Sequence, residues 1–280
     1  MAGPAVLAAC GGDDDGGTGA TPSGSGSAGE LALWAFFQDG VQVAGRQRFA
    51  VGLGDAAEIW GADRAPDELT VRIERDGQAV GQPLTLSRHG KGLERAYYPL
   101  RTELTEPGVY RAVADVDGEA AALAFTVAER GQVDVPGAGD AMVPVDTPTT
   151  ADAHGVDPIC TREPHCPYHD VTLTEALADG RPVALVVATP AFCATAVCGP
   201  ILDIVDTASE GLRDRIHVLH AEVYADGAGG TPAPVMEAYG LTYEPCLFLA
   251  DGRGTVVERL DVLFDETEAR QALERLAALS

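Results

Sequence analysis

The sequence predicts two domains, an all-β sandwich followed by an α/β domain. The chain has 280 residues, of which 46% are hydrophobic, so it is long and apolar enough for two cores. Residues 30–130 hold short runs with period-2 alternation, whereas residues 158–280 alternate strand-like with helix-like runs. Residues 131–157, rich in Pro, Gly, Thr and Asp, separate the two and are expected to form a linker.

The N-terminus resembles a bacterial lipoprotein signal. Leu7-Ala8-Ala9-Cys10 is similar to a lipobox, in which the new N-terminal cysteine is lipidated after cleavage. We expect residues 1–10 to be a truncated signal and residues 11–29, rich in Gly and Ser, to be a flexible tether. The resemblance implies a protein anchored through Cys10 at the extracytoplasmic face of the cell membrane, where disulfides are allowed. The alternative is a disordered tail that happens to contain a cysteine.

The predicted sandwich is built from seven β-rich runs with turn signals between them. Leu69, Val71 and Ile73 show the alternation of a strand with one buried face. Seven short strands in about 100 residues are typical of an antiparallel sandwich. The runs cover residues 31–37, 46–54, 69–77, 78–87, 93–100, 108–118 and 119–129.

The end of this half, "EPGVYRAVADVDGEAAALAFTV", resembles the closing hairpin of bacterial immunoglobulin-like domains. Within it, Tyr110 is similar to the position whose hydroxyl ties down a loop. The resemblance implies an immunoglobulin-like sandwich. No catalytic constellation occurs in this half of the sequence, so we expect it to have a binding or spacer role.

The second domain is expected to alternate strands and helices, which implies a sheet covered on both faces. The first two strands are joined through a helix and should be parallel, whereas Asp251-Gly252 joins the last two as an antiparallel pair. Helices are expected over residues 172–180, 198–212, 231–241 and 265–279, and strands over residues 181–190, 215–223, 245–251 and 254–262.

The net charge of the chain excludes some classes of binding partner. A net charge of −24 argues against binding to nucleic acid, whose phosphates would be repelled. It also argues against electrostatic docking onto anionic lipid. The oligomeric state is not predictable from these features.

Residues 171–280 resemble the thioredoxin superfamily. In that superfamily a reactive cysteine follows the first buried strand, after an aromatic residue, and Phe192-Cys193 occupies this place. A cis-proline at the start of the third strand faces that cysteine, and Pro245 matches it. The resemblance implies that Phe192 and Pro245 position the substrate, and it predicts a cis peptide bond before Pro245. Thioredoxins space their cysteines C-x-x-C, however, whereas Cys193 and Cys198 are separated by four residues.

This cysteine pair predicts a membrane-tethered thiol–disulfide oxidoreductase acting on protein or small-molecule thiols and disulfides. Cys193, between a strand and a helix, is the expected nucleophile, and Cys198 would attack the mixed disulfide that forms there. Residues five apart within one helix lie about 8 Å apart, beyond disulfide reach, so residues 193–197 should be loop or should unwind.

Three alternatives to this function stay open. The wider spacing is similar to a subgroup of peroxiredoxins, which implies a thiol peroxidase, although Pro190 stands where their motif has Thr. The pair could instead be two buried structural thiols. The chain could also be a non-enzymatic binding lipoprotein with a thioredoxin-like scaffold.

A second group, "DPICTREPHCPYHD", contains Cys160, Cys166, His165 and His169. We expect a structural disulfide between Cys160 and Cys166, with a metal site or a second redox pair as alternatives. No metal and no cofactor are predicted. Cys246 is expected to be a buried thiol or another partner for Cys193.

Overall fold

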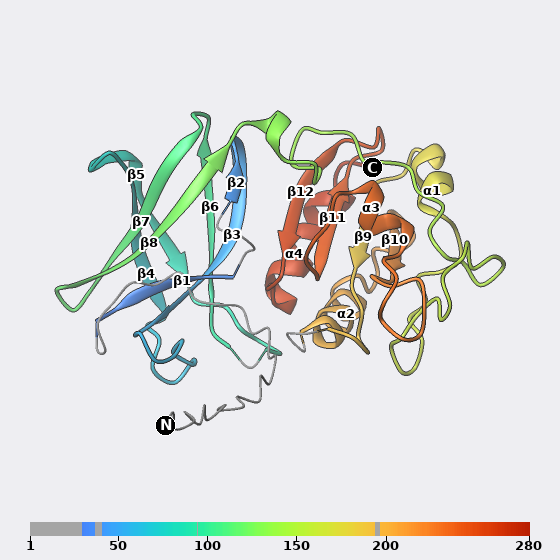
Figure 1. The fold of residues 1–280 in the computed structure, drawn as a ribbon, viewed down its shortest axis with the longest axis horizontal. Coiled ribbons are helices and arrows are strands. Elements are labelled where there is room, and N and C mark those ends of the chain that lie inside the picture. Colours follow the sequence, from blue (N-terminus) through green and yellow to red (C-terminus); the bar gives the residue numbers. More distant parts are fainter. Residues whose placement is uncertain (1–29, 37–40, 94, 194–196) are drawn as a thin grey trace, which may run out of the picture.

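The computed structural model describes the chain except residues 1–29, 37–40, 94 and 194–196 (Figure 1). The predicted signal over residues 1–10 with its Cys10 and the tether over residues 11–29 lie outside the described residues. The described part consists of two β-sheets side by side, each with its own hydrophobic core. None of its helices has the length and apolar character needed to span a membrane.

The first sheet has eight strands, and each of the seven predicted runs overlaps one of them, although β6 extends four residues beyond its run. The order of the sheet is β5-β4-β7-β8-β1-β3-β6, and β2 also pairs with β8. The strands are β1 Ala32–Ala35, β2 Val41–Val43, β3 Gly45–Gly54, β4 Glu68–Arg75, β5 Gln78–Ser87, β6 Tyr98–Leu104, β7 Gly108–Val116 and β8 Glu119–Ala128.

The predicted fold class, an immunoglobulin-like sandwich followed by an α/β thioredoxin-like domain, is wrong. Strand β1 pairs antiparallel with β3 and parallel with β8, which joins the strands into one nearly closed, barrel-like sheet instead of two packed sheets. The described part of the chain is mostly β, with 37% of its residues in strands and 16% in helices. Its second sheet is small and flanked by short helices, so it lacks the α/β thioredoxin-like arrangement expected.

The second sheet has the order β10-β9-β11-β12. The predicted parallel pairing of β9 and β10 is confirmed, as is the antiparallel pairing of β11 and β12. Its strands are β9 Val183–Val187, β10 His217–Ala221, β11 Cys246–Ala250 and β12 Val256–Asp261, and its helices are α1 Leu173–Asp179, α2 Cys198–Ala208, α3 Pro234–Ala238 and α4 Glu266–Ala277.

Local sequence explains where these helices begin. Thr172 caps α1, and its side chain and that of Glu175 bond reciprocally to backbone amides, a capping box. Gly180 ends α1 in the left-handed conformation, with φ of 80°. Asp265 caps α4 by accepting from the amide of Glu268.

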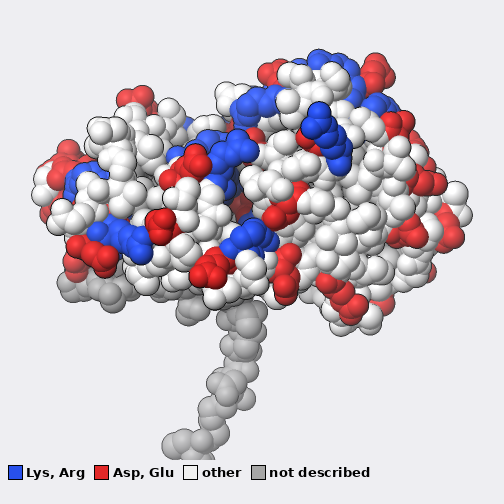
Figure 2. Space-filling model, turned by 90° about the horizontal axis from the view of Figure 1, so that it is seen from above, with Lys and Arg blue, Asp and Glu red and all other residues white. Residues whose placement is uncertain are grey.

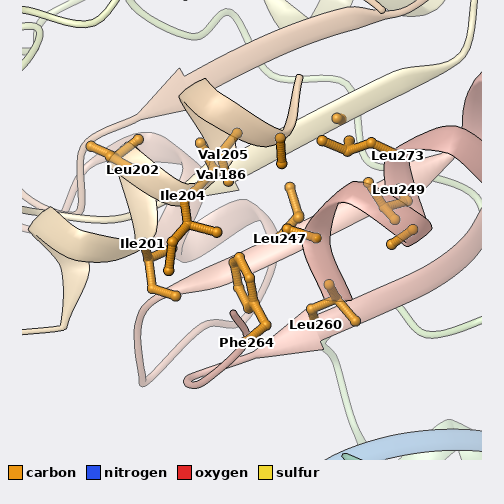
Figure 3. Close-up of a cluster of buried hydrophobic side chains, with 14 of the residues drawn as sticks. Val186, Ile201, Leu202, Ile204, Val205, Leu247, Leu249, Leu260, Phe264 and Leu273 are labelled. Atoms are coloured by element: carbon orange, nitrogen blue, oxygen red, sulfur yellow. The ribbon is translucent and has the colours of Figure 1, made fainter. Parts of the chain in front are cut away.

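Each face of the second sheet is covered by a separate apolar cluster. Side chains alternate along β9, so Ala184 and Val186 face one cluster while Leu185 and Val187 face the other. The first cluster, shown in Figure 3, packs α2 and α4 against the sheet. The segment expected as a linker packs on the second cluster through Val135, Met142 and Val156. Both faces of the sheet are therefore covered by apolar side chains.

The two sheets are bridged by buried charges between β3 and α4. The Arg48 guanidinium donates to both carboxylate oxygens of Glu268, at 2.9 and 2.5 Å. Beside this contact is a hollow of about 480 Å³, in which Arg46, Arg130 and Arg259 are among the lining residues. Figure 2 shows Lys and Arg side chains on both sides of the groove between the halves. The lining of this hollow includes no cysteine.

Candidate functional site

Cys193 and Cys198 lie together where β9 gives way to α2. Helix α2 begins at Cys198, so Cys193 precedes the helix, as the distance argument from the sequence required. The Cys198 thiol is completely buried, whereas Cys193 is partly exposed. Their sulfurs are 2.6 Å apart, close to the roughly 2.05 Å of a disulfide bond. The pair is therefore placed to interconvert between dithiol and disulfide.

The surroundings of Cys198 favour its protonated form. Its thiol donates to the Sγ of Cys193. This hydrogen bond, together with burial and the charge of Cys193, raises the pKa of Cys198 far above its usual value. Cys193 is thus the more accessible sulfur of the pair.

Glu244 completes this site and was not identified from the sequence. A carboxylate oxygen of Glu244 and the sulfurs of Cys193 and Cys198 all lie within 4.8 Å of one another. Burial and the negative charge of Cys193 raise the pKa of Glu244 to about 7. A carboxyl group with this pKa beside two thiols can accept or return a proton at neutral pH. The clue available in the sequence was its position directly before Pro245.

Phe192 is held firmly beside Cys193. Its ring meets that of Tyr224 edge-on, with centroids 5.9 Å apart and an interplanar angle of 87°. On its other side is Gly229, where a Cβ would lie 2.9 Å from the ring. Gly229 also has φ of +73°, so both the backbone and the ring favour glycine there. Phe192 therefore fixes the backbone that leads into Cys193.

Cys246 begins β11, directly after Glu244 and Pro245. The peptide bond between Glu244 and Pro245 is cis, which confirms the prediction. Cys246 is buried, and it packs in the apolar cluster on the opposite face of the sheet from Cys193 and Cys198. The structure therefore does not bring Cys246 to Cys193 as a second partner.

The other cysteine group forms a compact cluster with two histidines. The sulfurs of Cys160 and Cys166 are 3.6 Å apart and both thiols are free, so the expected disulfide is not formed in the structure. His169 and His220 contact the sulfur of Cys166, at 3.3 and 3.4 Å. His165, which the sequence placed in this group, is exposed and stays outside it. His220, on β10, was missed because it is distant in the sequence.

Hydrogen bonds connect this cluster to the cysteine pair. Thr161, next to Cys160, donates to Glu222 through its amide at 2.6 Å and its hydroxyl at 2.9 Å. The same hydroxyl accepts from the amide of Ala191 at 3.1 Å. Since Ala191 lies two residues before Cys193, the Cys160 loop helps to hold the approach to the reactive sulfur.

Comparisons with known proteins show no family for this chain. No family model matches it, and no curated protein matches it. An engineered protein of known structure matches at 16% identity and a TM-score of 0.25, over 37% of this chain and 21% of that one. This chain therefore spans about a fifth of the length of that structure.

Other solved structures are equally distant. The complex of titin M10 with an obscurin-like 1 immunoglobulin domain matches at 17% identity and a TM-score of 0.19, over 32% of this chain and 81% of that one. An endo-β-1,4-mannanase from Cellulomonas fimi matches at 16% identity and a TM-score of 0.23, over 37% and 19%. These similarities are too weak to indicate a function.

The raised pKa of Glu244 predicts a measurable pH dependence of stability. Its folded pKa of about 7 exceeds the ordinary 4.5, so the folded state binds more protons between these values. Stability attributable to Glu244 should therefore fall as pH rises from about 4.5 to 7. The side chain of the Glu244→Gln variant cannot ionise. The free energy of unfolding of this variant should therefore increase relative to that of the wild type as pH rises. Urea titrations of both proteins at pH 5 and pH 8 test this, and an unchanged difference would refute the assigned pKa.

Proposed function

We propose that this protein exchanges thiols and disulfides, with Cys193 as the nucleophile and Cys198 as the resolving cysteine. The observation that carries the proposal is the asymmetric pair of sulfurs, 2.6 Å apart, of which one is partly exposed and the other fully buried. An external disulfide can reach the first sulfur, while the second is shielded but within bonding reach of it.

The reaction proceeds in two displacements. The Cys193 thiolate attacks a substrate disulfide, forms a bond to one substrate sulfur, and releases the other as a thiolate. Cys198 then loses its proton to the Glu244 carboxylate and attacks the Sγ of Cys193. The second substrate thiolate leaves and a Cys193–Cys198 disulfide forms. The substrate gains two electrons and the protein dithiol loses them, and the reverse sequence oxidises a substrate dithiol.

A partly exposed nucleophile can be reached by a bulky substrate. Cys193 is partly exposed beside the fixed ring of Phe192, so a protein segment carrying a disulfide can lie across both. We place this activity at the outer face of a membrane, with the chain tethered through Cys10, on the strength of the lipobox resemblance and the Gly- and Ser-rich tether.

The proposed roles predict opposite behaviour of two serine variants in cells. Cys198→Ser should accumulate a mixed disulfide through Cys193, because the resolving attack is lost. Cys193→Ser should accumulate none, because its remaining thiol is buried. Non-reducing electrophoresis after acid quenching, followed by mass spectrometry of the trapped species, measures both. Trapping by Cys193→Ser alone would reverse the roles, and trapping by neither variant would disprove thiol exchange, whether or not the protein consumes peroxide or serves as a binding scaffold.

A further inference from the structure

Four metal-ligating side chains converge in the core beneath the cysteine pair. Cys160, Cys166, His169 and His220 each present one sulfur or nitrogen atom, and these four atoms lie within 4.8 Å of one another. All four residues are buried, with between 1% and 6% of their surface exposed. They come from two parts of the chain, the loop before α1 and strand β10, so the fold itself assembles the group.

The separations between these atoms fit a tetrahedral shell. Zn–N bonds of about 2.0 Å and Zn–S bonds of about 2.3 Å place the two nitrogens about 3.3 Å apart, the two sulfurs about 3.8 Å apart, and mixed pairs about 3.5 Å apart. The nitrogens of His169 and His220 are 3.3 Å apart, and the sulfurs of Cys160 and Cys166 are 3.6 Å apart. The Cys166 sulfur lies 3.3 and 3.4 Å from the two nitrogens. Each of these separations agrees with its ideal tetrahedral value within about 0.2 Å.

In each imidazole, the nitrogen that points away from the cluster (the outer nitrogen) is hydrogen-bonded to a backbone carbonyl, as is usual for histidines that bind a metal. Nδ1 of His169 lies 3.1 Å from the carbonyl oxygen of Pro148, and Nε2 of His220 lies 2.9 Å from that of Ala188. A carbonyl oxygen accepts but cannot donate, so each outer nitrogen carries a proton. In the neutral imidazole the inner nitrogen of each ring then offers a lone pair to the centre of the cluster.

Charge and burial select the kind of ion. Two thiolates and two neutral imidazoles around a divalent cation make an uncharged unit, which a dry core can hold without a large desolvation cost. Two sulfurs and two nitrogens in a tetrahedron suit zinc better than the oxygen-seeking magnesium or calcium. With four protein ligands, no position remains for water, which is the pattern of a structural site.

We propose that Cys160, Cys166, His169 and His220 bind one Zn²⁺ ion in a closed structural site. This site is separate from the proposed exchange pair and replaces the expectation that the chain holds no metal. Through Thr161 and its bonds to Ala191 and Glu222, the ion would fix the loop that precedes Cys193. The group Cys193, Cys198 and Glu244 is a poorer candidate, because it offers three ligands and is partly exposed.

Metal analysis of the untagged full chain, purified with reductant and without chelator, tests the proposal. We expect about one zinc per chain in the wild type and in a Cys193→Ser/Cys198→Ser double variant. A Cys160→Ser/Cys166→Ser double variant should lose at least nine-tenths of it. The first double variant is the matched control, because it also removes two thiols. If the Cys193→Ser/Cys198→Ser variant keeps its zinc, the metal is not bound by the exchange pair, and this result holds even if the Cys160→Ser/Cys166→Ser variant folds poorly.

Cobalt supplies an independent readout. After zinc removal by a chelator, Co²⁺ added to reduced wild-type protein should give the visible absorption of a tetrahedral ion and a thiolate-to-cobalt charge-transfer band. His220→Asn should weaken Co²⁺ binding by at least about 10-fold, the lower bound for losing a ligand. The proposal is overturned if the wild type holds no zinc and takes up no cobalt. It is also overturned if the first double variant loses the metal, or if peptide mapping finds a Cys160–Cys166 disulfide.

Discussion

Replacing Glu268 with alanine is expected to lower the free energy of unfolding by about 3–5 kcal/mol, the usual cost of removing one partner from a buried ion pair. The side chains of Arg48 and Glu268 are 3% and 2% exposed. Alanine would leave the Arg48 guanidinium buried in the contact between the two sheets without its counter-charge. Urea unfolding followed by fluorescence and circular dichroism measures the loss.

Glu268 serves more than one partner, which is why the expected loss is large. The hydroxyl of Tyr97 donates to one carboxylate oxygen at 2.7 Å, and Arg101 donates to the other at 2.6 Å. Arg48 also donates to the backbone oxygens of Asp261 and Leu263, so its charge is fixed in place. Removing the carboxylate therefore leaves several buried donors without an acceptor.

A glutamate on the exposed side of the same helix supplies the control. Glu274 pairs with Arg270 one turn away, and its side chain is 52% exposed. Glu274→Ala should change stability by no more than about 0.5 kcal/mol. If Glu268→Ala is no more damaging than Glu274→Ala, the buried bridge does not stabilise the contact between the sheets.

The same pair adds an acid-sensitive component to stability. Burial alone would raise the pKa of Glu268, but the charge and hydrogen bonds of Arg48 outweigh it and lower the pKa. The contribution of Glu268 to the free energy of unfolding is therefore fully present above its ordinary pKa of 4.5, and it is lost as pH falls through the lower pKa of the folded state.

Local patterns in the sequence predicted the second sheet well. The apolar run over residues 181–190 became β9, and the Asp251-Gly252 turn led to the antiparallel pair β11 and β12. The capped start of α1 also formed as expected. These features depend on residues close together in the chain, where periodicity and capping act directly.

Sheet closure in the first half could not be predicted in the same way. The β-rich run over residues 31–37 indicates a strand but does not say which strands it joins. Strand β1 pairs with β3 on one side and with β8, about 90 residues later, on the other. That second pairing converts the expected sandwich into a nearly closed sheet, and it depends on contacts that no local pattern encodes.

The same difference between local and long-range features applies to the candidate metal site. Cys160, Cys166 and His169 were recognised because they are neighbours in the sequence. His220 lies 54 residues beyond Cys166 and reaches it only because β10 pairs with β9. The available clue was a second histidine on a short strand whose other residues, after His217, are apolar. A buried histidine needs partners for both ring nitrogens, and this requirement could have prompted a search for a ligand set.

Replacing Cys193 with alanine is expected to reduce the rate of disulfide exchange by about 1,000-fold or more, because the nucleophile itself is lost. Of the five described cysteines, Cys193 is the one that is not buried. The remaining thiols cannot substitute for it, since Cys198 is fully enclosed and Cys160 and Cys166 belong to the other cluster. The rate is measured with reduced protein and an aromatic disulfide whose released thiolate absorbs visible light.

Cys246→Ala is the matched control for this loss. Cys246 is fully buried on the opposite face of the sheet, so its removal takes away a thiol without touching the exchange pair. We expect this variant to keep the wild-type rate within about 2-fold, although it should unfold more easily because of the small cavity left behind. Equal loss of activity in both variants would indicate a general defect in folding. A Cys193→Ala variant that still exchanges at the wild-type rate would mean that the nucleophile lies elsewhere in the chain.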